Sequence, residues 1–530
     1  MTRRKPLKMV NEDDPFDDEF EKMVKDTLEL WHVPGVSVAV VDGDITWSKG
    51  YGIATFPSTL VSPSTLYFAG STTKAFTAAI MSFLVDDNEK YPHLQWDTPI
   101  ATLIRDDFVL ENEYATQHTT IEDSLSHRTG LPGHDFSLGG PNATVQTVVR
   151  NLRHLPITAE PRTKYMYCNA MFIVASHVIE TVTGRKLGDL MHEWIWKPLG
   201  MDATFFDLES AKNAKEHLAT AYRWLYDNRE RGFQAVDWMT LDEASGAGAV
   251  ITNVLDYAKW ARAILRKETP LSEKGFEAVF TPRTLIPIEE PFTGPRSYGL
   301  GWRMGVYRGQ RFYEHSGGMK GFGAELIIFP DVDFAFVALA NTAGTANFVD
   351  LKLGFSLVDE KLKVPLKERF DWNERRVSQR IISEGRQKAK NAVQILYPHL
   401  PSRPLPLSLP LSSYAGTYRH PAYQTLTIYV SSPDTSSNPA STFNASEEQR
   451  KSILKADRTQ TTWIQMLTFE HVSGEFFVAR AKGEADFAAL FDDVYPVEFR
   501  NGVDGKVKEV GVGWEESMGN EKIWFRRVEK

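Results

Sequence analysis

The stretch G-S-T-T-K-A-F-T-A-A-I-M-S-F-L, residues 70–84, combines a helical pattern with two chemically reactive side chains. Its large apolar residues recur three and four positions apart, which predicts a helix over 72–86 with a broad, buried face. Ser71 and Lys74 stand three positions apart, so the helix brings the hydroxyl and the amine within mutual reach. Burial lowers the pKa of an amine, and a neutral lysine can activate a serine as a nucleophile.

The same S-x-x-K spacing recurs at Ser452 and Lys455, where the flanking residues are polar and predict a loop. An isolated S-x-x-K is most often a helix N-cap followed by an exposed lysine. Lys74 differs because an apolar run follows it, which gives the amine a reason to be desolvated. We therefore take Ser71 as the candidate nucleophile, with the backbone N–H groups of the helix start beside it.

Strand signals lie at both ends of the region around this helix. Two β-branched runs joined by the turn signal Asp42-Gly43 predict a hairpin, and two more strands are expected late in the region. The expected strands are 36–41, 45–47, 324–329 and 334–339, and the expected helices between them are 171–191 and 254–266. This arrangement predicts one sheet built from distant parts of the chain.

The composition changes after Pro365. Residues 366–395 are charged and helix-prone; a nucleic-acid-binding patch is one interpretation, but the interleaved acidic residues favour a solvated or domain-bridging helix. Prolines within 398–410 predict a linker. From Tyr414 onward, short strands separated by turn residues predict a small antiparallel barrel or sandwich, with a mobile Ser/Pro/Thr-rich loop at 431–446.

Composition excludes several classes of protein. The chain has 530 residues, of which 42% are hydrophobic and 24% charged, the balance of a folded protein with about two to four domains. A net charge of −9 provides no global positive field for nucleic acid or an anionic membrane. The single cysteine, Cys168, excludes an internal disulfide framework and fits a reducing compartment. With neither a signal peptide nor a run of about 20 apolar residues, we expect a cytoplasmic protein.

Other catalytic and cofactor motifs are missing from the sequence. There is no G-x-S-x-G elbow, no G-x-x-x-x-G-K-[ST] phosphate loop and no H-E-x-x-H zinc helix, so neither a metal nor an organic cofactor is expected. His134-Asp135 is compatible with a metal ligand or an acid–base pair, but its Gly/Pro-rich surroundings favour a turn. Cys168 is interpreted as a packing residue rather than a nucleophile.

Two further motifs follow the S-x-x-K element, Tyr167-Cys-Asn169 and His315-Ser-Gly317. With S-x-x-K, Y-x-N and H-x-G in this order, the chain resembles the serine β-lactamase and penicillin-binding-protein superfamily, specifically the class C β-lactamase-related peptidases and esterases of the S12 type. The resemblance spans about 30–345 and includes further landmarks in the expected order. These landmarks are Pro34–Val36, Leu125–Pro132, Pro198–Met201, Ser245–Gly248 and Tyr298–Trp302.

The resemblance implies a role for each motif residue. Ser71 would be acylated, and Tyr167 would serve as base and acid, either as a phenolate or through a proton shared with Lys74. Tyr165 is a rival for this role, but only Tyr167 has an asparagine two positions on. That residue, Asn169, would orient Lys74 and bind a substrate amide.

The third motif differs from that of the lactamases. There, K-T-G presents a permanent cation, whereas the His315 imidazole, with a reference pKa of about 6.5, is mostly neutral at pH 7. We hypothesise that the enzyme depends less on an anionic substrate group and is a poor β-lactamase; a histidine that only fills a sheet edge is the alternative. The resemblance also places the backbone N–H groups of Ser71 and Gly318 at an oxyanion hole, although Gly317-Gly318 is equally compatible with a β-bulge.

The resemblance implies an α/β (α+β) fold. A β-lactamase/transpeptidase-like domain, with an antiparallel sheet flanked by helices and an all-helical subdomain, would precede a small antiparallel β-barrel domain. Tyr414–Tyr418 resembles the opening of the lipocalin-like modules appended to some of these hydrolases. The expected domains are an N-terminal extension at 1–25, a catalytic domain at 26–364, a helical and Pro-rich linker at 365–410 and a lipocalin-like barrel at 411–530.

We expect a cofactor-free serine hydrolase that acts on an amide, peptide or ester through an acyl-enzyme on Ser71. An acyltransferase would use the same acyl-enzyme, and a non-catalytic scaffold is the alternative from another class. The expected partner is a small-molecule or short peptide substrate, with no nucleic acid and no membrane. The C-terminal domain could shape substrate access or mediate self-association, and the sequence leaves both open.

Overall fold

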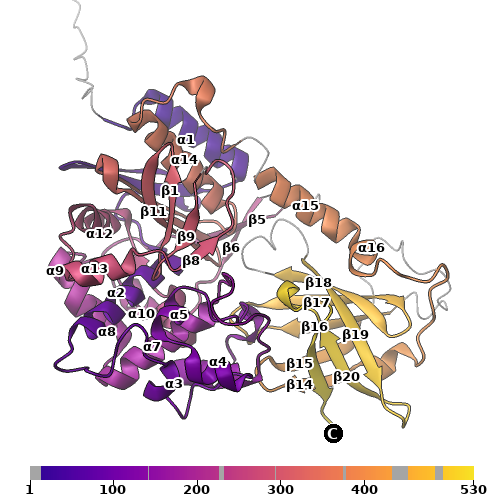
Figure 1. Cartoon of the computed structure of the whole chain (residues 1–530). Helices are drawn as coiled ribbons and strands as arrows, with labels where there is room; N and C mark the ends of the chain where they lie inside the picture. Colours follow the sequence, from indigo (N-terminus) through magenta and orange to yellow (C-terminus); the bar gives the residue numbers. More distant parts are fainter. Residues whose placement is uncertain are drawn as a thin grey trace, which may run out of the picture.

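The structure is a computed structural model that describes residues 14–140, 142–225, 232–292, 294–373, 378–431, 452–483 and 493–529. A large domain of helices and a sheet is followed by a smaller β-barrel that lies beside it (Figure 1). The expected α/β domain with an antiparallel sheet, followed by a C-terminal barrel, is thus confirmed.

The central sheet of the large domain is antiparallel and joins strands from both ends of that domain. β1 pairs with β13, so residues 36 and 340 lie side by side, which confirms the prediction of one sheet built from distant parts of the chain. The strand order is β3-β2-β1-β13-β12-β11-β10-β9-β8. The strands are β1 (Gly35–Asp42), β2 (Ile45–Thr55), β3 (Thr59–Leu60), β8 (Thr284–Ile286), β9 (Arg296–Tyr298), β10 (Arg303–Tyr307), β11 (Gln310–Met319), β12 (Phe322–Phe329) and β13 (Phe334–Ala340).

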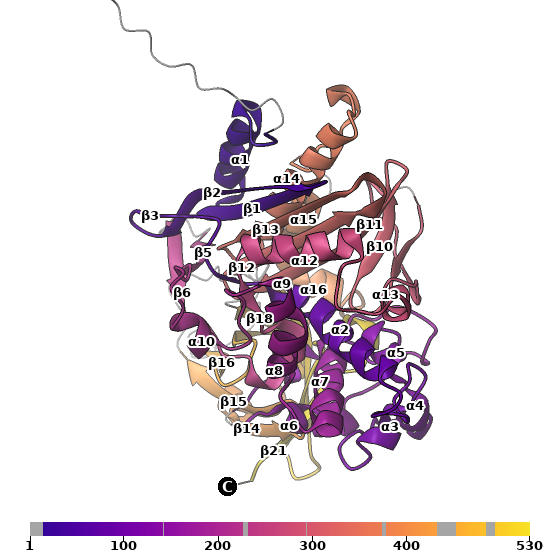
Figure 2. The same cartoon turned by 90° about the vertical axis from the view of Figure 1, so that its left-hand side faces the viewer.

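Helices cover both faces of this sheet (Figure 2). α1 (Asp18–Trp31) and α14 (Ala346–Lys361) pack on one face, and α12 (Val254–Arg266) packs on the other, against β1 and β13. β12 and β13 are buried on both sides, which explains why they consist mainly of apolar residues. The domain boundary expected at residue 25 falls inside α1, whose Val24 is fully buried in the core.

A helical subdomain lies below the sheet in Figure 1. Its central helices, α2 (Thr73–Asp86) and α7 (Asn169–Thr183), contact each other and are almost completely buried. The pattern at 171–191 forms two helices because Gly184 ends α7 in the left-handed conformation. None of the helices in the described ranges is long and apolar enough to cross a membrane. The remaining elements of the large domain are α3 (Ile100–Leu103), α4 (Glu113–His118), α5 (Ile121–Leu125), α6 (Val145–Asn151), α8 (Leu187–Met191), α9 (Lys197–Leu199), α10 (Leu208–Lys212), α11 (Ser245–Gly248), α13 (Glu273–Val279), the pair β4 (Tyr67–Phe68) and β7 (Ile251–Thr252), and the pair β5 (Ala221–Leu225) and β6 (Gly232–Val236).

The C-terminal strands close into a barrel. Antiparallel pairing runs from β14 round to β21, which pairs with β14 again. α15 (Ser378–Lys390) and α16 (Ala392–Leu396) run from the large domain to the barrel in Figure 1, in agreement with the domain-bridging interpretation of 366–395. The loop expected at 431–446 lies, apart from Ser431, outside the described residues. The barrel strands are β14 (Gly416–His420), β15 (Gln424–Ser431), β16 (Ile453–Arg458), β17 (Gln465–Ser473), β18 (Phe476–Gly483), β19 (Asp493–Asn501), β20 (Val507–Val512) and β21 (Ile523–Arg527).

One carboxyl group is buried in α14 without a partner. Asp350 is fully buried, and neither of its carboxyl oxygens has a hydrogen-bond partner among the described residues. Burial raises the pKa of Asp350 well above its usual value. The folded state therefore holds a proton that the unfolded chain releases above about pH 4, and stability falls as the pH rises above that value.

We expect Asp350→Asn to increase the free energy of unfolding by about 1–3 kcal/mol near pH 8 and by less near pH 5, because the amide cannot ionise. Urea unfolding of both proteins at the two pH values measures the difference. The same effect at both pH values, or a loss of stability at the higher one, would show that ionisation of Asp350 does not limit stability.

Candidate active site

Ser71 lies where the buried helix begins and the chain passes close to the sheet. It belongs to the short turn η1 (Gly70–Thr72), directly before α2, and its side chain is partly exposed. Gly70, with a φ of 53°, allows the close approach of β11, since a Cβ there would lie 2.9 Å from the nitrogen of Gly318. The pairing of β11 with β12 runs through Gly317 and Gly318 without a register shift, so the β-bulge alternative is not observed.

The Lys74 amine is fully buried and has three hydrogen-bond acceptors. Its Nζ lies 3.0 Å from Ser71 Oγ, 2.8 Å from Asn169 Oδ1 and 2.8 Å from the backbone oxygen of Ala247. Burial lowers the pKa of Lys74 to about 7. A large fraction of the amine is therefore neutral near pH 7 and can accept the Ser71 proton.

Tyr167 contacts the same serine from another side. Its hydroxyl lies close to the Ser71 side chain, and Lys74 Nζ lies 5.0 Å from the centre of its ring. Burial raises the pKa of Tyr167 to about 12, although Arg303 acts in the opposite direction. The phenol thus keeps its proton at neutral pH, which favours a proton shared with Lys74 over a phenolate.

Asn169, the first residue of α7, stands between Lys74 and an acidic side chain. Its Oδ1 accepts from Lys74, and its Nδ2 donates to Oδ1 of Asp135 at 2.9 Å. Burial raises the pKa of Asp135. The interpretation of His134-Asp135 as a turn describes the backbone, which forms η2 (Asp135–Ser137), but it misses that the Asp135 side chain enters the site.

His315 lies on β11 with a fully buried ring. Its Nδ1 donates to the backbone oxygen of Ser316 at 2.7 Å, and its Nε2 accepts from the Tyr298 hydroxyl at 2.9 Å. Burial and the charge of Arg303 keep the pKa of His315 well below its usual value, so the imidazole is neutral. Both ring nitrogens are used within the protein, and a direct contact of His315 with substrate stays a prediction.

Arg303 is a residue of the site that the sequence reasoning missed. Its Nη1 donates to Ser316 Oγ at 3.0 Å, and its guanidinium lies near the Tyr165 hydroxyl and 5.9 Å from the Tyr167 ring centre. Because a guanidinium is always charged, the site has a permanent cation even though the histidine of the third motif is neutral. The hypothesis of a weak dependence on an anionic substrate group stays a prediction, and its test has to include Arg303 as well as His315. An arginine in a buried strand, directly after the landmark Tyr298–Trp302, was the available signal.

Known proteins are similar to this chain in sequence and in fold. The family described as Beta-lactamase matches residues 20–356, well over half of the chain, and the family described as Domain of unknown function (DUF3471) matches residues 400–527. The chain belongs to the beta-lactamase family. Its hydrolase relatives within this family identify it as a serine hydrolase.

Relatives of this beta-lactamase family member include an unguisins hydrolase of Aspergillus campestris, 45% identical over 519 residues, which are 97% of this chain and 92% of the relative. The octameric penicillin-binding protein homologue from Pyrococcus abyssi superposes with a TM-score of 0.58 at 17% identity, covering 96% of this chain and 99% of that one. A D-amino acid amidase from Ochrobactrum anthropi gives 0.54 at 22% identity, covering 65% and 97%. These two structures have the same fold.

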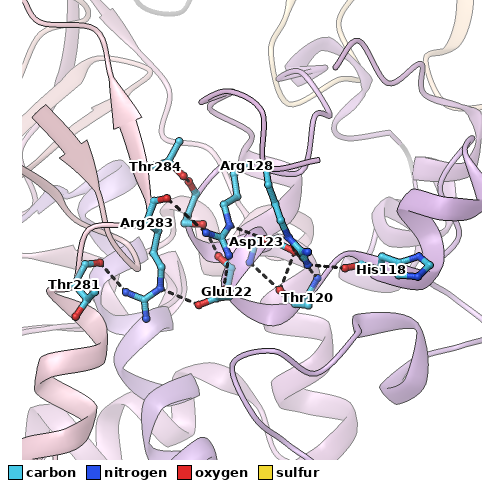
Figure 3. Close-up of polar contacts among 10 residues, drawn as sticks. His118, Thr120, Glu122, Asp123, Arg128, Thr281, Arg283 and Thr284 are labelled. Carbon is cyan, nitrogen blue, oxygen red and sulfur yellow. Dashed lines mark hydrogen bonds and ion pairs between the residues drawn. The ribbon is translucent and has the colours of Figure 1, made fainter. Parts of the chain in front are cut away.

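An ion-pair network holds the segments that lead into this site (Figure 3). Asp123 is fully buried in α5 and accepts from Arg128 at 2.6 Å and from Arg162 at 2.8 Å, while Glu122 accepts from Arg283 at 2.9 Å. Burial would raise the pKa of Asp123, but the hydrogen bond from Arg162 and the other cation lower it below its usual value. Because Arg162 precedes the Y-x-N motif and Arg283 precedes β8, the network joins the helical subdomain to the sheet edge.

His127, in the landmark Leu125–Pro132, packs against the ring of Tyr167. Its ring is fully buried with its centre 4.3 Å from that of Tyr167, and its Nδ1 accepts from the Cys168 N–H at 3.1 Å. Burial keeps the pKa of His127 well below its usual value and raises that of the Cys168 thiol to about 12. Both side chains are therefore neutral, and the packing role expected for Cys168 agrees with its complete burial.

The rate of the reaction is expected to follow the protonation of Lys74. If its neutral amine takes the Ser71 proton, kcat/KM rises as the pH increases through about 7. Arg303 lowers the pKa of Lys74, so Arg303→Gln should move this limb to higher pH. Profiles of kcat/KM against pH with one uncharged ester measure the shift. Arg311→Gln, which removes an exposed arginine paired with Asp331, is the matched control; equal behaviour of the two variants would refute the expectation.

Proposed function

We propose that the protein hydrolyses an amide bond of a peptide substrate through an acyl-enzyme on Ser71. The observation that carries this proposal is the 3.0 Å contact between Lys74 Nζ and Ser71 Oγ, together with the Tyr167 hydroxyl close to the same serine. The serine hydroxyl has on one side an amine whose pKa is about 7 and on the other a phenol, and these supply the base and the acid that amide cleavage requires.

In the acylation step, the Lys74 amine takes the Ser71 proton, directly or through Tyr167, as Ser71 Oγ forms a bond to the substrate carbonyl carbon. The backbone N–H groups of Ser71 and Gly318 donate to the oxyanion that develops. The carbon–nitrogen bond then breaks as the proton on Lys74 passes through the Tyr167 hydroxyl to the leaving nitrogen. The amine product departs, and Lys74 is neutral again.

In the deacylation step, a water molecule takes the place of the departed amine. The same amine–phenol pair accepts a water proton as the water oxygen bonds to the acyl carbon, and Ser71 Oγ recovers a proton when the ester bond breaks. An alcohol or an amine in place of water would give acyl transfer through the same steps. If the reaction is hydrolysis, the free acid is the main product even when an alcohol or an amine is added as an acyl acceptor. Mass analysis of the products measures this.

Hydrolysis is supported by the relative named unguisins hydrolase, which aligns with almost the whole chain. The choice of a peptide amide is supported by a D-aminopeptidase of Cereibacter sphaeroides, which is 25% identical over 59% of this chain. A panel of unguisins, D- and L-aminoacyl anilides, p-nitrophenyl esters and a chromogenic cephalosporin tests the proposal. We expect at least one amide of the panel to be cleaved with a higher kcat/KM than the cephalosporin. Faster cleavage of the cephalosporin than of every amide, or no turnover together with no acylation of Ser71, would refute it.

A further inference from the structure

The C-terminal barrel contacts two segments that lie next to hydrogen-bond partners of Lys74, the loop that carries Asp135 and the turn η5. One partner, Asn169 Oδ1, is backed by Asp135, to which the other end of the same amide donates. The second partner, the backbone oxygen of Ala247, lies in α11, which directly follows η5 (Asp242–Ala244). In this turn, Oε1 of Glu243 accepts from the Thr462 hydroxyl of the barrel at 2.5 Å.

The loop 133–140, which carries Asp135, lies against the mouth of the barrel. Buried backbone oxygens need hydrogen-bond donors, and three oxygens of this loop receive them from the barrel. The donors are Arg458 to the Phe136 oxygen at 2.8 Å, the Thr462 N–H to the Leu138 oxygen at 3.1 Å, and the Gln424 side chain to the Gly139 oxygen. The barrel thus holds the part of the loop that follows Asp135.

Two glycines make this close contact possible. Gly139 and Gly140 have φ values of 93° and 123°, where other residues are strained. A Cβ on Gly139 would lie 2.3 Å from the Thr462 nitrogen, and one on Gly140 would lie 2.4 Å from Gln424 Oε1. The sequence of the loop is therefore adapted to the barrel, not only to a turn.

The neighbours of Asp135 are also anchored by side chains. His134 is fully buried; its Nε2 donates to the Pro156 oxygen at 2.9 Å, and its Nδ1 accepts from the Tyr423 hydroxyl of the barrel at 2.7 Å. Burial lowers the pKa of His134 to about 4, so this arrangement persists at neutral pH. On the other side of Asp135, Phe136 packs against two aromatic rings of the barrel.

We propose that Asp135 is a positioning residue that turns the Asn169 amide toward Lys74, and that the barrel belongs to the active site because it holds Asp135 in place. This inference rests on the proposed function, in which Lys74 is the base. A carboxylate accepts hydrogen bonds but does not donate them, so Asp135 fixes Asn169 Nδ2 on its own side and leaves Oδ1 for Lys74. Without the carboxylate, Asn169 can turn its Nδ2 toward the amine and lose this hydrogen bond.

The first test replaces Asp135 in the full-length protein. We expect Asp135→Ala to lower kcat about 10- to 100-fold with little change in KM, because a supporting partner of a catalytic group is lost. The carboxylate raises the pKa of Lys74, so Asp135→Asn should move the limb of the pH profile to lower pH. The titratable and charged groups that face Lys74 are Asp135, Arg303, Cys168, Tyr167, His127 and His315.

Glu515 of the barrel needs a control, because it titrates in the same range. Burial, together with the charge of Asp135, raises the pKa of Glu515 to about 7, and its Oε1 lies 3.8 Å from His134 Nδ1. The shift caused by Asp135→Asn should persist when it is measured in a Glu515→Gln background. If the shift disappears there, the limb belongs to Glu515, and the proposed link between Asp135 and Lys74 is wrong.

The second test changes the barrel side of the contact. We expect Tyr423→Phe, which removes the hydroxyl that donates to His134, to lower kcat about fivefold, the effect of one buried hydrogen bond. Gly139→Ala should have a larger effect, since the added methyl overlaps the barrel backbone. Tyr429→Phe, which removes a hydroxyl bonded to Asp457 on the outside of the barrel, is the matched control and should leave kcat unchanged.

Acylation of Ser71 by a reactive ester, measured by peptide mass in every variant, separates the two possible failures. If the wild type is not acylated on Ser71, the proposed function fails. If it is acylated, and both Asp135→Ala and Tyr423→Phe keep the wild-type acylation rate, the positioning role is overturned. If Asp135→Ala does not fold, Asp135→Asn replaces it, because it keeps the size and shape of the side chain. A pH limb of kcat/KM that does not move to lower pH in Asp135→Asn then overturns the proposal.

Discussion

Replacing Ser71 by alanine is expected to reduce hydrolysis about 10⁴-fold or more and to abolish covalent labelling of the active-site peptide. Ser71 Oγ is the atom that would form the acyl bond; Lys74 donates a hydrogen bond to it, and the Tyr167 hydroxyl lies close to it. Removing this oxygen leaves the base and the acid without a nucleophile. Steady-state kinetics, together with the intact mass and peptide map after treatment with a reactive ester, measure both effects.

The second S-x-x-K of the chain provides the matched control for Ser71→Ala. Ser452 directly precedes β16, so Lys455 lies on a strand and the pair lacks the helical geometry of the first motif. Ser452→Ala should therefore be labelled and turn over substrate like the wild type. Unchanged turnover in Ser71→Ala, or labelling of another residue in that variant, would disprove the assignment of the nucleophile.

Replacing Tyr167 by phenylalanine is expected to lower kcat by about 10²- to 10⁴-fold, the usual contribution of a proton-transfer group. The phenylalanine ring can keep the contact with His127, so the loss reports on the hydroxyl rather than on packing. Without the hydroxyl, the proton on Lys74 has no relay to the leaving nitrogen. Single-turnover acylation rates with an amide substrate measure the effect most directly.

Tyr165→Phe distinguishes the two tyrosines that precede Asn169. The Tyr165 hydroxyl lies near the Arg303 guanidinium, whereas that of Tyr167 lies close to Ser71. We expect Tyr165→Phe to retain kcat within about tenfold, the effect of one lost hydrogen bond to a charged group. A larger loss in Tyr165→Phe than in Tyr167→Phe would show that Tyr167 is not the proton relay.

The parts of the fold that follow from local patterns were predictable. The helix that carries Lys74 has an apolar spacing that only a buried helix explains, and the turn at Asp42-Gly43 determines the first hairpin. The residues of the three motifs were found by their order and spacing, and the structure brings Ser71, Lys74 and Tyr167 within hydrogen-bonding reach or ring contact of one another.

Residues whose role depends on distant neighbours were not predictable. Asp135 lies in a Gly/Pro-rich loop, and nothing local indicates that Asn169 donates to it. Arg303 reaches Ser316 from a neighbouring strand, a contact that depends on the register between β10 and β11. From the sequence, Gly139 and Gly140 look like ordinary turn residues. A sequence does not distinguish a glycine needed for its φ from one needed for the close approach of another domain.

The pairing of β1 with β13 affects when the enzyme becomes competent during its synthesis. Ser71 and its helix leave the ribosome early, but the strand that closes the sheet beside β1 is made much later, and the barrel that borders Asp135 later still. Non-local strands can pair only when both have been made. During most of translation, Ser71 therefore lacks the late strands that complete its site. The fold itself thereby delays the assembly of the site until the late strands of the sheet have been made.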